Sequence, residues 1–122
     1  MRIEQITLHH LRMPLAAPFE TSFGRITDRE CILLEVASEG LTGIGECVAD
    51  RDPGYAYETT GTAWHILNDF ISPAILGKDV TGPADYRGRV TGVRGHPMAK
   101  AGLEMALWDL LGKREGRSLQ EL

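Results

Sequence analysis

Side chains that could do metal, thiol or acid–base chemistry are few in this chain and lie far apart. Cys31 and Cys47 form no CxxC pair, and no histidine cluster accompanies either thiol. A zinc or redox site would need such neighbours, so we predict two buried free thiols. The alternative is a disulfide between adjacent strands, which a reducing compartment disfavours. The histidines, which also lack paired carboxylates at ligand spacing, are His9, His10, His65 and His96. The sequence therefore predicts no metal ligand and no catalytic residue within the chain.

The composition is typical of one globular domain. A chain of 122 residues can bury one hydrophobic core, and its 43% hydrophobic and 25% charged residues are ordinary for such a domain. A net charge of −4 without any Lys/Arg cluster excludes a nucleic-acid surface. No run approaches the roughly 20 apolar residues of a membrane span, and the first residues lack the apolar run of a secretory signal. We therefore expect a cytoplasmic protein with no membrane partner.

Three stretches of the first half have the pattern of β-strands, namely residues 3–13, 30–38 and 41–48. Pro14 and Pro18 should end the pairing of the first strand, because proline has no N–H to donate to a ladder. The second strand is apolar on both faces, so we expect both faces to be covered. Glu39 and Gly40 form a turn signal, which makes the second and third strands an antiparallel hairpin.

Helical patterns occupy the second half, over residues 63–75, 83–90 and 97–111. Thr59 or Thr60 should cap the first helix, and Pro73 should kink or shorten its last turn. The second helix is the weakest of the three patterns. The order of elements predicts an α+β fold, in which a three-stranded antiparallel meander is followed by about three helices.

The last predicted helix is apolar nearly all round, which is typical of a helix covered on several sides. Its small residues Ala99, Gly102 and Ala106 indicate that another backbone comes close along one side. Gly43 and Gly45 would weaken the third strand, so something should approach that strand closely as well.

The same helix carries a family resemblance. From Ala99 to Lys113 the chain reads Ala-Lys-Ala-Gly-Leu-Glu-Met-Ala-Leu-Trp-Asp-Leu-Leu-Gly-Lys. This segment resembles the first signature of the mandelate racemase/muconate-lactonizing branch of the enolase superfamily. The resemblance implies an enolase-type N-terminal capping domain over residues 1–95. Residues 96–122 would be its final helix and the start of a linker into a C-terminal barrel, which is missing from the chain.

Shorter segments that begin at Met13, Thr21 and Gly45 resemble the o-succinylbenzoate synthase/N-acylamino acid racemase subgroup. The resemblance implies an enzyme that abstracts a proton next to a carboxylate of a small-molecule substrate, with the enediolate held on Mg²⁺, and that is a homo-oligomer. Alternatives are a dipeptide epimerase or a muconate cycloisomerase of the same superfamily, or a stand-alone module that binds a small acid without catalysis.

The catalytic groups of the family have no counterpart here. In the family the base lies in a Lys-x-Lys segment of the barrel and three acidic residues hold the metal; the chain has no Lys-x-Lys, and a barrel alone takes about 250 residues. We therefore expect the chain alone to bind no Mg²⁺ and to catalyse no reaction. Asp109, inside an apolar helix, should need a partner if buried, and we expect that partner in the barrel.

By resemblance, two loops of the capping domain close over the barrel and contact the distal part of the substrate. Aromatic side chains in such loops offer flat apolar surface, while hydroxyls offer hydrogen bonds. The charge at the start of the second loop bears on the acyl group that the enzyme prefers. The alternative is that Phe19 and Phe23 pack beneath their own loop and that Tyr55 packs against the next helix. The predicted substrate-binding residues are Phe19, Thr21, Ser22 and Phe23 in the first loop, and Asp50 and Tyr55 in the second.

Overall fold

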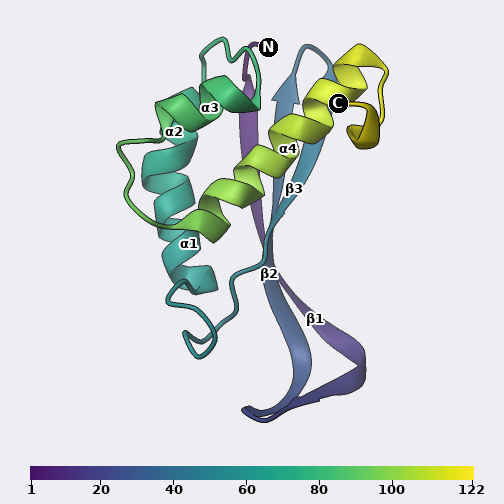
Figure 1. The fold of residues 1–122 in the computed structure, drawn as a ribbon, viewed down its shortest axis with the longest axis vertical. Helices are drawn as coiled ribbons and strands as arrows, with labels where there is room; N and C mark the ends of the chain where they lie inside the picture. The colour runs from purple at the N-terminus through teal and green to yellow at the C-terminus, as the bar shows by residue number, and fades with distance from the viewer.

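A long antiparallel hairpin and a short third strand form the sheet of the computed structural model, which describes residues 1–122. The strands are β1 (Gln5–Thr21), β2 (Gly24–Ser38) and β3 (Leu41–Cys47), in the order β1-β2-β3. Because β3 pairs only with residues 32–38 of β2, the rest of the hairpin extends beyond the sheet as an arm (Figure 1). We call residues 14–28 the hairpin arm.

The hairpin arm corrects the prediction that the first strand stops pairing at Pro14 and Pro18 and that a loop carries Phe19 and Phe23. Regular pairing runs to Pro14 opposite Asp28 and resumes with Phe19 opposite Ile26, so four residues of β1 face one residue of β2. Both prolines lie on an edge strand at this irregularity, where a missing N–H disturbs no central ladder. The two strands consequently continue to a tight turn at residues 22–23.

The helices follow in the predicted order: α1 (Thr60–Ile66), η1 (Leu67–Ile71), α2 (Ser72–Ile75), α3 (Pro83–Arg89), α4 (Pro97–Glu115) and the short η2 (Leu119–Glu121). The first three form one continuous helix, capped at Thr59 by a hydrogen bond from the backbone N–H of Thr62. Its middle part, η1, is a π-helical segment in which the Ser72 N–H reaches back to the Leu67 carbonyl. Pro73 follows directly, and the wider turns before it accommodate the ring without breaking the helix.

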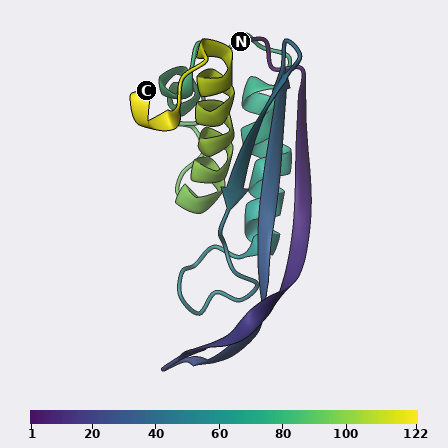
Figure 2. The same ribbon diagram turned by 90° about the vertical axis from the view of Figure 1, so that its right-hand side faces the viewer.

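All the helices lie on one face of the sheet (Figure 2). Ile32, Leu34 and Val36 point into this layer and are fully buried. Leu33 points the other way and is half-buried, with no second layer from this chain over that face. The prediction that both faces of β2 are covered is therefore wrong within these residues. No helix of the chain combines the length and the hydropathy needed to cross a bilayer.

Helix α4 packs directly on the backbone of β3, as the glycine pattern predicts. A Cβ atom at Gly43 would lie 2.0 Å from the Ala106 carbonyl oxygen, and one at Gly45 would lie 2.1 Å from that of Gly102. On the helix side, a Cβ at Gly102 would lie 2.9 Å from Cys47 Cβ. Glycine on both surfaces thus sets the distance between the helix and the strand.

The end of α4 lies beyond the predicted boundary at residue 111. The helix continues through Gly112 and stops at Gly116, which adopts the left-handed conformation with φ of 65°. A Cβ at Gly112 would lie 2.8 Å from the Arg117 carbonyl oxygen, so this glycine admits the returning chain and does not break the helix.

Both cysteines are free and buried, as predicted. Desolvation by burial raises the pKa of both the Cys31 and the Cys47 thiol. A raised pKa reduces the thiolate fraction, so neither side chain has the properties of a reactive thiol.

Candidate functional site

The tip of the hairpin arm exposes aromatic side chains on one side and a charged pair on the other. Phe19 and Ile26 are directly opposite in the register, so both side chains point to the same side of the hairpin. Phe19 is 59% exposed and Phe23, in the turn, is 89% exposed. Glu20 and Arg25 form the next opposite pair, 3.8 Å apart, on the other side. The tip is therefore amphipathic, and neither phenylalanine packs beneath it.

Hydroxyl groups at the tip are used in part by the turn itself. The Phe23 backbone N–H donates to Thr21 Oγ1 at 3.1 Å, and the same hydroxyl lies 3.4 Å from the Gly24 carbonyl oxygen. Ser22 is exposed in the turn. The hairpin thus brings all four predicted residues of the first loop together at one end of the molecule.

The second loop, residues 50–57, leaves β3 and leads into α1 at the same end of the domain as the hairpin arm (Figure 1). Tyr55 is 87% exposed, so it does not pack against α1. Asp50, by contrast, is held at the beginning of the loop, where its carboxylate lies 2.6 Å from the guanidinium of Arg29. A cavity of about 230 Å³ lies between them and is lined by Arg29, Val48, Asp50, Asp52, Tyr55, Ala56, Glu58 and Met98.

The far end of the second loop is fixed to the beginning of α4. Glu58 is 2% exposed, and its carboxylate accepts the backbone N–H groups of Met98 at 2.8 Å and Ala99 at 3.1 Å. The hydroxyl of Tyr57 accepts the His96 N–H at 3.0 Å. An anionic group at the N-terminus of a helix is favourable because free N–H groups and the helix dipole both point toward it.

Glu30 joins the base of the hairpin to the start of α1. Its carboxylate lies 3.1 Å from His10 Nε2 and accepts the Thr60 hydroxyl at 3.2 Å, while Arg51 approaches to 3.9 Å. The hydrogen bond with His10 is the largest cause that lowers the pKa of the Glu30 carboxyl below its ordinary value of 4.5; burial opposes it, and Thr60 lowers the pKa further.

We expect Glu30→Gln to lower stability more near pH 7 than at about pH 3. A carboxyl whose pKa is lower in the folded than in the unfolded state stabilises the fold above its unfolded pKa of 4.5, and this stabilisation is lost as the pH falls through the folded value. Urea unfolding of both proteins at the two pH values measures the difference. Glu20→Gln, in the exposed pair with Arg25, is the control. A difference for Glu30→Gln that does not shrink in acid would contradict the prediction.

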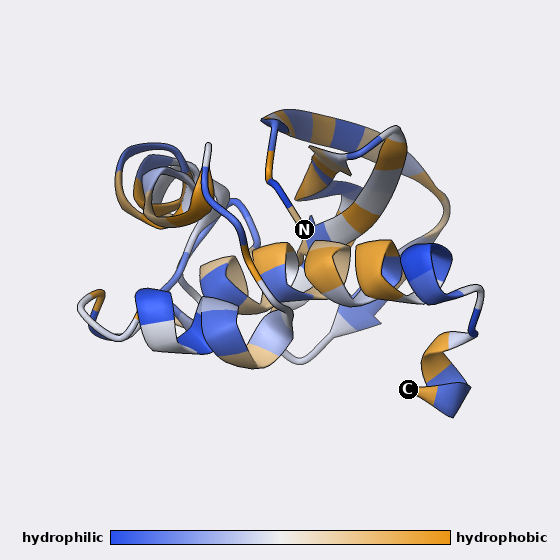
Figure 3. Cartoon of the chain, turned by 90° about the horizontal axis from the view of Figure 1, so that it is seen from above, coloured by the Kyte–Doolittle hydropathy of each residue, from blue (hydrophilic) through white to orange (hydrophobic).

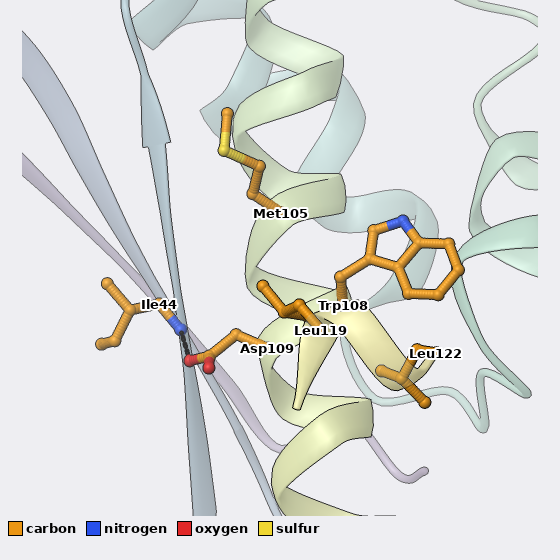
Figure 4. A pocket seen from close by; sticks show the side chains of 6 residues that line it. All are labelled: Ile44, Met105, Trp108, Asp109, Leu119 and Leu122. Carbon is orange, nitrogen blue, oxygen red and sulfur yellow. Dashed lines mark hydrogen bonds between the residues drawn. The ribbon is translucent and has the colours of Figure 1, made fainter. Parts of the chain in front are cut away.

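An apolar groove lies on the opposite side of α4 from the core, between the helix, the free edge of β3 and the C-terminal turn. It has a volume of about 590 Å³ and is lined by Ile44, Met105, Trp108, Asp109, Leu119 and Leu122 (Figure 4). Met105 is 44% and Leu119 59% exposed. Apolar residues recur along α4 up to its charged last turn (Figure 3), and the side that carries Met105 and Trp108 is not covered by the sheet or by α1 and α3.

Asp109 has partners inside the chain, and its expected contact with the barrel stays a prediction. Its Oδ2 accepts the Ile44 N–H at 2.8 Å and lies 2.7 Å from Lys113 Nζ (Figure 4 shows the first of these). Lys113 also donates to the Thr42 carbonyl at 2.7 Å. The two side chains thus satisfy an N–H and a C=O on the free edge of β3, which would otherwise be open to pairing.

The model of the mandelate racemase/muconate lactonizing enzyme N-terminal domain matches residues 3–122. The chain belongs to this family. It is 44% identical to an o-succinylbenzoate synthase of Geobacillus stearothermophilus over 99% of its length, and 45% identical to an N-succinylamino acid racemase of Thermus thermophilus over 100%. A solved member of the enolase superfamily from Listeria innocua superposes with a TM-score of 0.92 at 33% identity over 99% of the chain.

The family match covers the N-terminal part of longer proteins. The chain spans about a third of the length of these relatives, 32% and 33% of the two enzymes and 33% of the Listeria structure. The fold prediction, an enolase-type capping domain with an open three-stranded sheet, is confirmed by these neighbours. Relatives that consist of a capping domain and further sequence imply a C-terminal domain for the complete protein.

Sequence reasoning missed the residues that hold the two loops in place. Arg29, Glu30 and Glu58 each contact a segment at least 20 residues away along the chain. The available signal was chemical: each is a charged side chain beside an apolar strand or helix start, where an unpaired charge would be unfavourable. No group of three or more His, Cys, Asp or Glu side chains lies close enough together to hold a metal ion.

Proposed function

We propose that the chain is the substrate-specificity domain of an enolase-superfamily enzyme that abstracts a proton next to a carboxylate, as an o-succinylbenzoate synthase, an N-acylamino acid racemase or both. The observation that carries this proposal is the exposure of Phe23 and Tyr55 on two loops at one end of a domain of this family. Large exposed aromatic side chains are typical of surfaces that meet a ligand or a partner.

The loops would act by closing over a bound carboxylate. The aromatic rings of Phe19, Phe23 and Tyr55 would cover the apolar part of the substrate and exclude water. The hydroxyls of Thr21 and Ser22 would donate hydrogen bonds to the substrate. Exclusion of water strengthens the electrostatic stabilisation of a developing enediolate. Mg²⁺ supplies that stabilisation in the family, but the side chains of this chain offer no matching set of ligands, and we assign the metal to the rest of the protein.

The apolar groove would receive the C-terminal barrel domain. If so, the isolated chain exposes the groove, and we expect it to bind an apolar fluorescent dye and to self-associate. Met105→Ser with Leu119→Ser should reduce both effects, since these residues contribute exposed apolar surface there. Leu76→Ser is the matched control, because Leu76 is 47% exposed but lies outside the groove. Light scattering that shows a monomer without dye binding would contradict the prediction.

A substrate panel on the complete protein tests the proposed function. We expect dehydration that forms o-succinylbenzoate or racemisation of N-acylamino acids, and a KM that rises several-fold in Phe23→Ala and Tyr55→Ala with kcat less affected. Phe70→Ala is the control, since Phe70 is 52% exposed on η1 and outside both loops. Activity only on dipeptides or on muconate would show that the enzyme is instead a dipeptide epimerase or a muconate cycloisomerase. Tight binding of a small acid without turnover would indicate a binding module.

A cytoplasmic location and a homo-oligomeric state stay predictions for the complete protein. Cell fractionation tests the first, and light scattering of the complete protein tests the second.

A further inference from the structure

We infer that Arg29 is a positioning residue that holds the second loop on the base of the hairpin arm, and that Asp50 acts through Arg29 and not by contact with substrate. The inference rests on the proposed role of the two loops, and adds to it the residues that place them relative to each other.

Arg29 joins β2 to the start of the second loop through two contacts of one guanidinium group. It extends from β2, where its side chain is 31% exposed. One nitrogen donates to Asp50 Oδ1 at 2.6 Å and the other to the Val48 carbonyl oxygen at 2.8 Å. Both contacts fall where the chain leaves β3 and the second loop begins. A planar guanidinium that binds two acceptors at once fixes direction as well as distance, which a single charge contact does not.

The neighbouring contacts make the attachment continuous with α1. The Asp50 carbonyl oxygen accepts the Thr60 N–H at 2.8 Å, and Thr60 also donates its hydroxyl to Glu30, the residue after Arg29. Two consecutive residues of β2 therefore hold the two ends of the second loop at one level of the hairpin. Loss of these contacts would therefore allow the second loop to move relative to the hairpin arm.

The carboxylate of Asp50 is already bound by Arg29. Its carboxylate has a charged partner at 2.6 Å, and moving it to a substrate would break that contact and leave the Arg29 guanidinium with the Val48 carbonyl alone. Tyr55 follows Asp50 by five residues and is exposed. It has no such partner and is free to contact a ligand. Residues at the start of the loop therefore position the loop, and exposed residues in its middle contact the substrate.

Hydrogen exchange on the 122-residue chain tests the positioning role directly. In Arg29→Met we expect the Thr60 amide to exchange at least about tenfold faster, because its acceptor is the Asp50 carbonyl, while the Ile44 amide in the middle of β3, which donates to Asp109, keeps its rate. Arg12→Met is the matched control, since it removes the neighbouring Arg12–Asp28 pair without touching the second loop. An unchanged Thr60 rate in a folded Arg29→Met protein would overturn the inference.

A double-mutant cycle in the complete enzyme tests how Asp50 acts. We expect Arg29→Met and Asp50→Asn each to raise KM about tenfold with kcat within about threefold, and the double variant to match either single variant. Arg29→Lys, which keeps the charge but not the two-acceptor geometry, should be intermediate. Additive effects would show that Asp50 contacts substrate independently, and would overturn its assignment to Arg29.

The two tests separate the inference from the function on which it rests. Faster Thr60 exchange with an unchanged KM would support the positioning of the loop by Arg29 and count against a role of that loop in substrate binding. Faster exchange together with a raised KM supports both.

Discussion

Gly45→Ala is expected to destabilise the domain by about 3 to 5 kcal/mol and to lower its melting temperature by more than about 10 °C. The added Cβ would lie 2.1 Å from the Gly102 carbonyl oxygen and 2.7 Å from the Ala106 nitrogen. Both are backbone atoms of α4, so no side chain can turn away to make room. The helix must move off β3, and the core between them must open.

The control for this substitution is Gly88→Ala. Gly88 lies inside α3, and nothing is within 4 Å of the position its Cβ would take. Alanine in a helix interior is favoured over glycine by about 0.5 to 1 kcal/mol, so the control should stabilise the domain. Thermal and urea unfolding followed by circular dichroism measure both changes. Equal effects of the two substitutions would show that α4 is not held at the distance the structure gives.

The contact between α4 and β3 is also the part of the fold that the sequence predicted best. Gly43 and Gly45 stand at alternate positions of a strand, and Gly102 and Ala106 stand four apart on a helix. These spacings place each pair on one face, and two faces without side chains can approach each other closely. The information was local to each segment, so the sequence predicted a close approach for each of them but not that the two pack on each other.

The hairpin arm could not be predicted in the same way. Its residues include two prolines, Ser22 and Gly24, which favour a loop by composition. What makes the segment a hairpin is the pairing of its own two halves, which depends on a register irregularity that no residue type specifies. The predicted site residues nevertheless lie together, because both a loop and a hairpin tip would gather neighbours in the sequence.

Contacts of charged side chains with backbone groups far away in the sequence were beyond prediction for a different reason. Asp109 and Ile44 are 65 residues apart, and Glu58 and Met98 are 40 apart. A single sequence shows that such a carboxylate needs a partner, but not which of several N–H groups or cations provides it. The sequence indicated that Asp109 needs a partner, but not that Ile44 and Lys113 provide partners within the chain.

Glu58→Gln is expected to cost about 3 kcal/mol, the second large effect. Helix α4 is preceded by its N-cap residue His96, which lies in the left-handed region and provides no side-chain cap. The buried carboxylate of Glu58 takes over this role by accepting the N–H groups of Met98 and Ala99. Glutamine has nearly the same shape but only one acceptor oxygen, so one N–H would face an amide NH₂ group and the negative charge at the helix N-terminus would be lost.

Glu115→Gln is the matched control for this carboxylate. Glu115 is in the last turn of the same helix, exposed and 3.3 Å from Arg117, and its substitution should change stability by less than about 0.5 kcal/mol. Hydrogen exchange adds a second measurement, since the Met98 and Ala99 amides should lose protection in Glu58→Gln and keep it in Glu115→Gln. If Glu58→Gln unfolded at the wild-type urea concentration, the carboxylate would not be the cap of α4. Because Glu58 also ends the second loop, loss of the cap would release the loop at its far end while Arg29 still held its beginning.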